Sequence, residues 1–188
     1  MIPNLNLALI HYLVLNKHQE IVTTSVTLFD IHDIARSSAT FGANEYLVIN
    51  PSVYQKKVVD RLLHFWKQGY GKQYNDNRTT AITKVQFFFT LDEGIQHLTD
   101  CYQKRPLLIG TSAKTHAQFP PLSFPELKAI LQYAPILLLL GTGWGLSNEV
   151  LQRCDRLLEP IPGSGEYNHL SVRAAAAIIL YRLMHETI

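Results

Sequence analysis

The sequence predicts an α/β fold in one domain over residues 1–188, with a single mainly parallel sheet and helices on both of its faces. Strand and helix signals alternate along the chain, which is the pattern of βαβ units. The run from residue 136 to 140 is continuously apolar, as expected for a strand that is buried on both faces. We find no internal repeat, linker or low-complexity segment that would divide the chain.

Each expected element rests on a local pattern. Residues 5–15 and 22–28 are rich in strand-forming side chains. A helix is expected over residues 30–41, with Asp30 as its N-cap and Gly42 as its stop. The remaining elements follow from apolar spacing: strands at 46–49, 85–89, 107–110, 136–140 and 156–159, and helices at 53–66, 91–102, 123–133, 147–154 and 170–184. The polar stretch 69–80 is expected to be an exposed loop.

The composition narrows the class of protein. Hydrophobic residues make up 47% and charged residues 17%, which is ordinary for a globular chain; the net charge of +2 permits a nucleic-acid partner without requiring one. The apolar runs are too short for a membrane span and the N-terminus lacks a basic signal-peptide start, so we expect a soluble, cytoplasmic protein. The two cysteines lie far apart and the eight histidines do not cluster with cysteine or carboxylate at ligand spacing, so no metal is expected.

The segment GTGWGL, residues 141–146, looks like a nucleotide-binding turn between a strand and a helix. It lacks the glycine spacing of the dinucleotide fingerprint, and no Gly-Lys-Ser/Thr follows it. A tight turn that only needs positive φ angles is the simpler alternative. Two more turns, at residues 109–113 and 159–172, also follow strands. Three such turns at one edge of a parallel sheet would expose backbone groups that can recognise an adenosyl group, so we expect a ligand crevice there.

In three blocks the sequence resembles the SPOUT, or α/β-knot, RNA methyltransferases, and in particular a bacterial branch of them. The blocks are residues 30–42, 137–146 and 159–183, in the order and spacing of that family. The resemblance implies a C-terminal deep trefoil knot, S-adenosyl-L-methionine (SAM) as methyl donor and S-adenosylhomocysteine (SAH) as product. It also implies an RNA substrate, tRNA or rRNA, and a homodimer formed through the last helix and the knot region.

Matching the motifs residue by residue implies a set of site residues. The cofactor would be held by Thr111, Leu140, Gly141, Gly143, Ile161, Gly165, Asn168 and Leu170. Arg36 matches the arginine that helps to activate the ribose hydroxyl in the 2′-O-methylating branch, and Asp30 and Asp33 accompany it as candidate catalytic residues. That branch favours asparagine at both aspartate positions, and its frequent acidic residue is missing from GTGWGL. Ribose 2′-O methylation and base-nitrogen methylation therefore both stay open.

The catalytic assignment has a structural alternative. Spacings of three place Asp30, Asp33 and Arg36 on one helix face, where a carboxylate could accept a proton from the methyl acceptor. The same residues could instead cap the helix, favour its dipole and form an Asp33–Arg36 ion pair. For the whole protein, the alternative function is a catalytically silent knot protein that binds SAM or SAH and RNA. A nucleotide-dependent oxidoreductase is disfavoured by the failed fingerprint.

A local excess of basic residues suggests an RNA-contact surface. Between residues 56 and 84 the chain has seven basic side chains against two acidic ones. Lys67, Lys72 and Arg78 are expected to neutralise phosphates, and Tyr70 and Tyr74 to stack on unpaired bases. A solvated helix face followed by a mobile loop is the alternative. The hypothesis places the main RNA contact there, beside the methyl-donor pocket.

Overall fold

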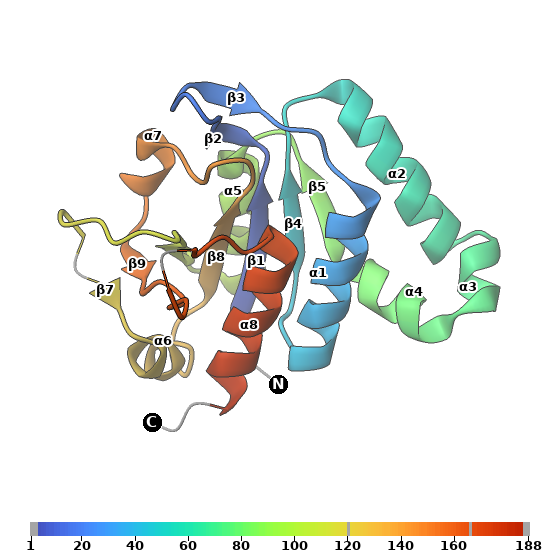
Figure 1. Ribbon diagram of the computed structural model, residues 1–188. Coiled ribbons are helices and arrows are strands. Elements are labelled where there is room, and N and C mark those ends of the chain that lie inside the picture. Colours follow the sequence, from blue (N-terminus) through green and yellow to red (C-terminus); the bar gives the residue numbers. More distant parts are fainter. Residues whose placement is uncertain (1–3, 120, 166, 186–188) are drawn as a thin grey trace.

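A seven-stranded sheet forms the centre of the molecule in the computed structural model, which describes residues 4–119, 121–165 and 167–185 (Figure 1). Its strand order is β5-β4-β1-β8-β6-β9-β7, and every neighbouring pair is parallel. The strands are β1 (Leu5–Ile10), β4 (Tyr46–Ile49), β5 (Val85–Phe88), β6 (Leu107–Gly110), β7 (Pro121–Leu122), β8 (Ile136–Gly141) and β9 (Arg156–Leu158). The expected parallel sheet is confirmed, and β7 is a strand that the sequence patterns did not indicate.

Helices cover both faces of this sheet, as predicted. They are α1 (Leu28–Phe41), α2 (Val53–Lys67), α3 (Tyr70–Tyr74), α4 (Asp76–Thr83), α5 (Leu91–Tyr102), α6 (Phe124–Ile130), α7 (Asn148–Leu151) and α8 (Val172–His185). One core cluster joins the sheet to α1, α2, α4, α6 and α8, and a second joins its other face to α5 and α7. None of the described helices is both long and apolar enough to cross a bilayer.

The central strands β1 and β8 are buried on both faces. In β1, Leu5, Leu7 and Leu9 belong to one core cluster, while Ala8 and Ile10 belong to the other, because successive side chains point to opposite faces. A strand in this position has no solvent-facing side, so its sequence is apolar throughout rather than alternating. The continuous apolar run that predicted a buried strand at residues 136–140 is explained in the same way.

The first expected strand, residues 5–15, is divided between two sheets. β1 ends at Ile10, and β2 (Tyr12–Leu15) pairs antiparallel with β3 (Ile21–Thr23) in a separate two-stranded sheet. The division occurs where β1 loses its ladder partners, because Ile10 pairs with the last residues of both β4 and β8. Beyond that edge the chain hydrogen-bonds with β3 instead. The extended segment expected at residues 22–28 is a strand only as far as Thr23.

Helix α1 begins earlier than predicted, and its N-cap is Thr27 rather than Asp30. The Thr27 hydroxyl accepts from the Asp30 backbone N–H at 3.1 Å and donates to the Asp30 carboxylate at 2.6 Å. Asp30 is therefore the third helical residue, where an acidic side chain still favours the helix dipole. The predicted stop is confirmed, because Gly42 has φ 76° and its N–H closes the last turn.

The prediction of a loop over residues 69–80 is wrong, because this segment folds into α3 and most of α4. Asn75 caps α4 by accepting from the Arg78 backbone N–H at 2.9 Å. Gly71 packs so closely on α2 that a Cβ there would lie 2.7 Å from the Trp66 ring. The Arg78 guanidinium covers the same ring at 5.0 Å. The polar composition predicted a loop, but packing against Trp66 gives these short helices their stability.

Candidate functional site

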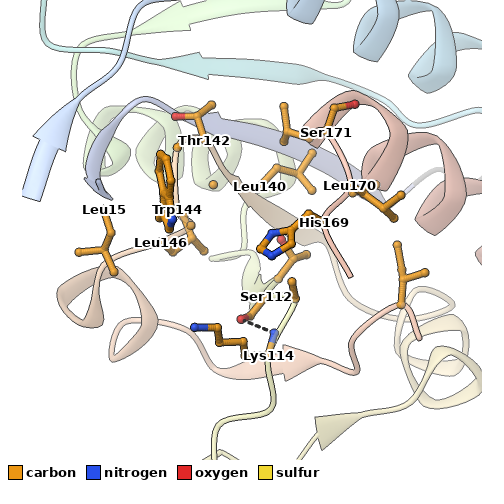
Figure 2. A pocket seen from close by; sticks show the side chains of 18 of the residues that line it. Leu15, Ser112, Lys114, Leu140, Thr142, Trp144, Leu146, His169, Leu170 and Ser171 are labelled. Atoms are coloured by element: carbon orange, nitrogen blue, oxygen red, sulfur yellow. Dashed lines mark hydrogen bonds between the residues drawn. The ribbon is translucent and has the colours of Figure 1, made fainter. Parts of the chain in front are cut away.

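A cavity of about 1020 Å³ lies at the carboxyl ends of β6, β8 and β9 (Figure 2). Three segments form much of its lining: the turn after β6, the turn after β8, and the chain between β9 and α8. Residues of the β2–β3 region and of α1 and α8 complete it. The expected meeting of three turns at one sheet edge is therefore confirmed. Seven of the eight residues predicted for the cofactor line the cavity, namely Thr111, Leu140, Gly141, Gly143, Ile161, Asn168 and Leu170. Gly165 does not; it is exposed, with no atom within 4 Å of where its Cβ would be.

The turn after β8 needs glycine for close backbone approach. A Cβ on Gly141 would lie 2.7 Å from the Leu146 nitrogen, and one on Gly143 would lie 2.7 Å from the Leu15 carbonyl oxygen. Gly143 also has φ 61°. Positive φ is therefore required at Gly143 but not at Gly141, whose constraint is steric crowding by the turn itself.

The β2–β3 hairpin clamps this turn, and the sequence patterns missed it. The Trp144 N–H donates to the Leu15 carbonyl at 2.8 Å, and the Leu15 N–H donates to the Gly145 carbonyl at 2.9 Å. One signal for the hairpin was present in the sequence, namely Asn16, a residue type that favours turns. Its side chain accepts from the backbone N–H groups of His18 and Glu20, and these bonds close the connection between the strands.

The turn after β6 brings polar side chains to the cavity. The Thr111 hydroxyl donates to the Leu139 carbonyl at 2.9 Å, which ties this turn to β8. The Ser112 hydroxyl accepts from the Lys114 N–H at 3.1 Å and lies 3.0 Å from the His116 ring nitrogen. Figure 2 shows the Lys114 and Ser112 side chains together at one side of the cavity. Neither Lys114 nor His116 was singled out from the sequence.

The chain between β9 and α8 forms the opposite wall. The Asn168 side chain donates to the Ile161 carbonyl at 3.1 Å, which holds the two ends of this segment together. His169, Leu170 and Ser171 follow and line the cavity before α8 begins (Figure 2). The last helix starts at Val172, two residues later than predicted, so these side chains belong to an extended wall and not to the helix.

A buried imidazole and two partly buried hydroxyl groups support the cavity from the positions that directly follow β1, β3 and β8. His11 Nδ1 lies 2.9 Å from the Thr24 hydroxyl, which is hydrogen-bonded to the Thr142 hydroxyl. Thr24 and Thr142 both line the cavity. Burial lowers the pKa of His11 from 6.5 to about 4, although the nearby Asp30 carboxylate opposes the change. His11 is therefore neutral at pH 7 and acts as a hydrogen-bonding support.

The three predicted catalytic residues separate in space. Asp30 lines the cavity, whereas Asp33 and Arg36 lie in a second groove of about 580 Å³. Arg173 of α8 pairs with both aspartates: its Nε is 3.4 Å from Asp30 and its Nη1 is 3.1 Å from Asp33. In place of the Asp33–Arg36 pair of the structural alternative, Asp33 makes a contact between α1 and α8. Arg173 could not be found from local spacing, because 140 residues separate it from Asp33.

The three predicted RNA-binding residues lie on the β5 side of α1, away from the cavity (Figure 1). Lys67 is half-buried; its ammonium donates to the Val85 carbonyl at 3.2 Å, and burial lowers its pKa. Arg78 stacks over Trp66, whereas Lys72 is exposed on α3. Two of the three cations therefore make contacts within the protein. Their contact with RNA stays a prediction.

One group of possible metal ligands contradicts the expectation that no histidine clusters with cysteine and carboxylate. Among the described residues, ligand atoms of Glu45, His97 and Cys101 all lie within 4.8 Å of one another. His97 and Cys101 are one turn apart on α5, and Glu45 precedes β4, so the group lies at the amino ends of the strands, away from the cavity. The Glu45 carboxylate already lies 2.8 Å from the His97 ring nitrogen, so these two groups are hydrogen-bonded to each other.

Comparison with known proteins agrees with this architecture. The chain matches the family described as SAM-dependent RNA methyltransferase over residues 4–185. It is 41% identical over 185 residues to a tRNA (guanine-N(1)-)-methyltransferase of Oleidesulfovibrio alaskensis, covering 98% of this chain and 43% of that protein. It is 37% identical over 180 residues to a protein of Aquifex aeolicus, covering 96% of this chain and 88% of that one. The chain thus spans less than half the length of the tRNA methyltransferase that it matches.

A solved structure shares the fold. The SpoU methyltransferase AviRb from Streptomyces viridochromogenes, in complex with AdoMet, aligns with a TM-score of 0.59 at 20% identity, covering 97% of this chain and 57% of that one. The SPOUT fold class expected from the sequence is confirmed by this likeness and by the parallel sheet. The family match extends over nearly the whole chain and includes every segment that lines the cavity. This protein therefore belongs to the SAM-dependent RNA methyltransferases.

Proposed function

We propose that SAM binds in the cavity between the three turns, and that the methyl group is transferred to a base nitrogen of tRNA. The observation that carries the proposal is the meeting of the three turns, which exposes backbone groups and apolar side chains in one cavity. The residues present fit an adenosyl group: the cavity is large enough, and Gly141 leaves the turn without a side chain where a Cβ would collide. Seven residues matched to the family's cofactor motifs line it.

Asp30 is the proposed proton acceptor. Bound SAM supplies an electrophilic methyl group, and a base N–H that receives it must lose its proton. The Asp30 side chain is 13% exposed, faces the cavity, and is held by the Thr27 hydroxyl and by Arg173. A carboxylate fixed in this way can accept that proton. Arg173 orients it from the neighbouring helix α8, and Asp33 of α1 pairs with the same arginine.

The tRNA and base assignments are supported by what is known of a relative. The protein from Oleidesulfovibrio alaskensis is described as acting on guanine N1 of tRNA, although this chain covers only 43% of it. Arg36 matches the arginine that assists ribose methylation in the 2′-O-methylating branch of the family. In this structure Arg36 lies outside the cavity of its own chain. A role for Arg36 at a cavity would require a second copy of the chain. RNA as substrate also implies that the reaction takes place in the cytoplasm.

A homodimer through α8 and the neighbouring α1 is part of the proposal, as is the trefoil knot implied by the resemblance. Tyr181 of α8 is 55% exposed and Met184 is exposed, although apolar side chains are usually covered. The half-buried Ala174 and Ala177 line the second groove, where a partner helix could approach closely. Sedimentation equilibrium at micromolar concentration should show twice the mass of one chain, and a single 21.4 kDa species would contradict the dimer.

Two measurements test the main proposal. Isothermal titration should show binding of SAM and SAH but not of NAD. Transfer of a labelled methyl group to unfractionated tRNA, followed by mass spectrometry of the nucleosides, should then identify a base-methylated product. Absence of SAM binding would contradict the cavity assignment. A ribose-methylated nucleoside would contradict the base assignment while leaving the cavity assignment intact.

A further inference from the structure

Trp144 is an exposed aromatic residue at the rim of the cavity, at the tip of the turn after β8. It is 61% exposed, whereas the other tryptophan, Trp66, is 7% exposed and belongs to the core. We propose that the indole of Trp144 is the stacking platform for the unpaired RNA base that receives the methyl group. This inference rests on the proposed function and adds the residue that holds the acceptor.

The backbone of this turn is fixed, which suits a platform. Trp144 is hydrogen-bonded through its N–H to Leu15, and the Gly145 N–H donates to the Thr142 carbonyl at 3.0 Å. On the far side of the turn, Leu146 forms an isolated bridge with Val14. The backbone that carries the ring is in place before RNA arrives, so little backbone entropy is lost on binding. An exposed ring with a fixed backbone is difficult to explain by stability alone, since burial would stabilise it more.

The cavity has room for a base beside the methyl donor. Sites for single small ligands usually enclose about 300–1,000 Å³, and this cavity of about 1020 Å³ lies just above that range. Figure 2 shows Trp144 on the side formed by the turn after β8, with His169 and Leu170 on the side formed by the segment before α8. A base that enters between these sides would meet the indole face.

Lysine side chains in this part of the molecule could bind the phosphates of a nucleotide whose base stacks on Trp144. Lys114 lines the cavity, and Lys17 is exposed on the β2–β3 connection, two residues before Gln19, which also lines it. Ammonium groups at these positions can neutralise the phosphates on either side of an extruded base. The tyrosines expected from the sequence to stack on bases are less suitable, because Tyr70 and Tyr74 stack on each other, with ring centroids 6.0 Å apart, beyond α1.

Four proteins test this inference: the wild type, Trp144→Phe, Trp144→Leu, and Tyr133→Leu as a control for the loss of an exposed ring away from the cavity. The probes are unfractionated tRNA and a short single-stranded RNA of mixed sequence, each with SAH present. RNA should quench the tryptophan fluorescence of the wild type but not that of the Phe variant. Trp144→Leu should weaken RNA binding by about 5- to 150-fold, the value of one stacked base, and Trp144→Phe much less.

SAH affinity, measured separately by calorimetry, shows whether the Trp144 indole stacks on the RNA base or on the cofactor. Unchanged SAH affinity together with weaker RNA binding in Trp144→Leu supports the platform. Wild-type RNA affinity in Trp144→Leu would overturn it, as would a loss of SAH affinity equal to the loss of RNA affinity, because the indole would then stack on the cofactor. These outcomes differ from failure of the proposed function, in which the wild type itself would bind no SAM and methylate no RNA.

Discussion

Residues 141–146 and 69–80 are two glycine-containing segments with opposite structures. The first is a turn clamped by the β2–β3 hairpin, and the second forms most of two short helices packed on Trp66. Their aromatic and basic side chains differ in availability as well. Trp144 is exposed at a cavity, whereas Arg78 is stacked on Trp66 and the two tyrosines are stacked on each other. Which groups are free to meet RNA is decided by packing and not by residue type.

The largest expected effect concerns Asp30, the predicted catalytic carboxylate that faces the cavity. Asp30→Asn should lower kcat by about 10²- to 10⁴-fold, because the amide cannot accept a proton. Asp33→Asn is the matched control, since Asp33 pairs with the same arginine but lies in the other groove. Steady-state methyl transfer to tRNA measures both. Equal losses in the two variants would show that the Arg173 contact matters rather than proton acceptance.

The second prediction concerns stability and pH at the His11 support of the cavity. The folded state holds the pKa of His11 at about 4, below its ordinary 6.5, so the unfolded chain takes up a proton first as the pH falls. The free energy of unfolding should therefore decrease by roughly 3 kcal/mol between pH 6.5 and 4 from this group. Urea unfolding of the wild type and of His11→Gln measures it. If the unfolding free energy of His11→Gln fell as steeply with pH as that of the wild type, the pH dependence would not come from His11.

The third prediction tests the crowding of the turn. Gly141→Ala places a Cβ 2.7 Å from the Leu146 nitrogen, so the turn must shift, and SAM affinity should fall by about 5- to 150-fold. Gly165→Ala, where a Cβ meets open space, should bind SAM as the wild type does. Calorimetric titration compares the two. Full SAM affinity in a folded Gly141→Ala protein would place the cofactor away from this turn.

The smallest expected effect concerns the α2–α4 region. Lys72 is exposed, so Lys72→Gln should reduce the slope of log affinity against log salt by about 1 if RNA passes over α3, without changing Tm. Arg78→Gln should instead lower Tm, since it removes the guanidinium from the Trp66 ring. Filter binding at several salt concentrations and thermal melting separate these effects. An unchanged slope for Lys72→Gln would exclude α3 from the RNA path.

The sequence by itself determined the elements whose patterns are local. Apolar runs gave the buried strands, since a strand covered on both faces needs apolar side chains throughout. Glycine and cap positions marked the α1 stop at Gly42 and the turn at Gly141–Gly145, because backbone geometry admits few other residues there. The family motifs led to seven residues that line one cavity.

Only the tertiary structure decided which distant residues meet. The pairing of Arg173 with Asp30 and Asp33, the clamp of Leu15 on the turn, and the packing of Arg78 on Trp66 all join segments that no local period relates. Local spacing offered an Asp33–Arg36 pair as the structural alternative, and polar composition predicted a loop at residues 69–80. Packing overrode both, because contacts between elements stabilise a side chain more than a solvent-exposed i,i+3 pair does.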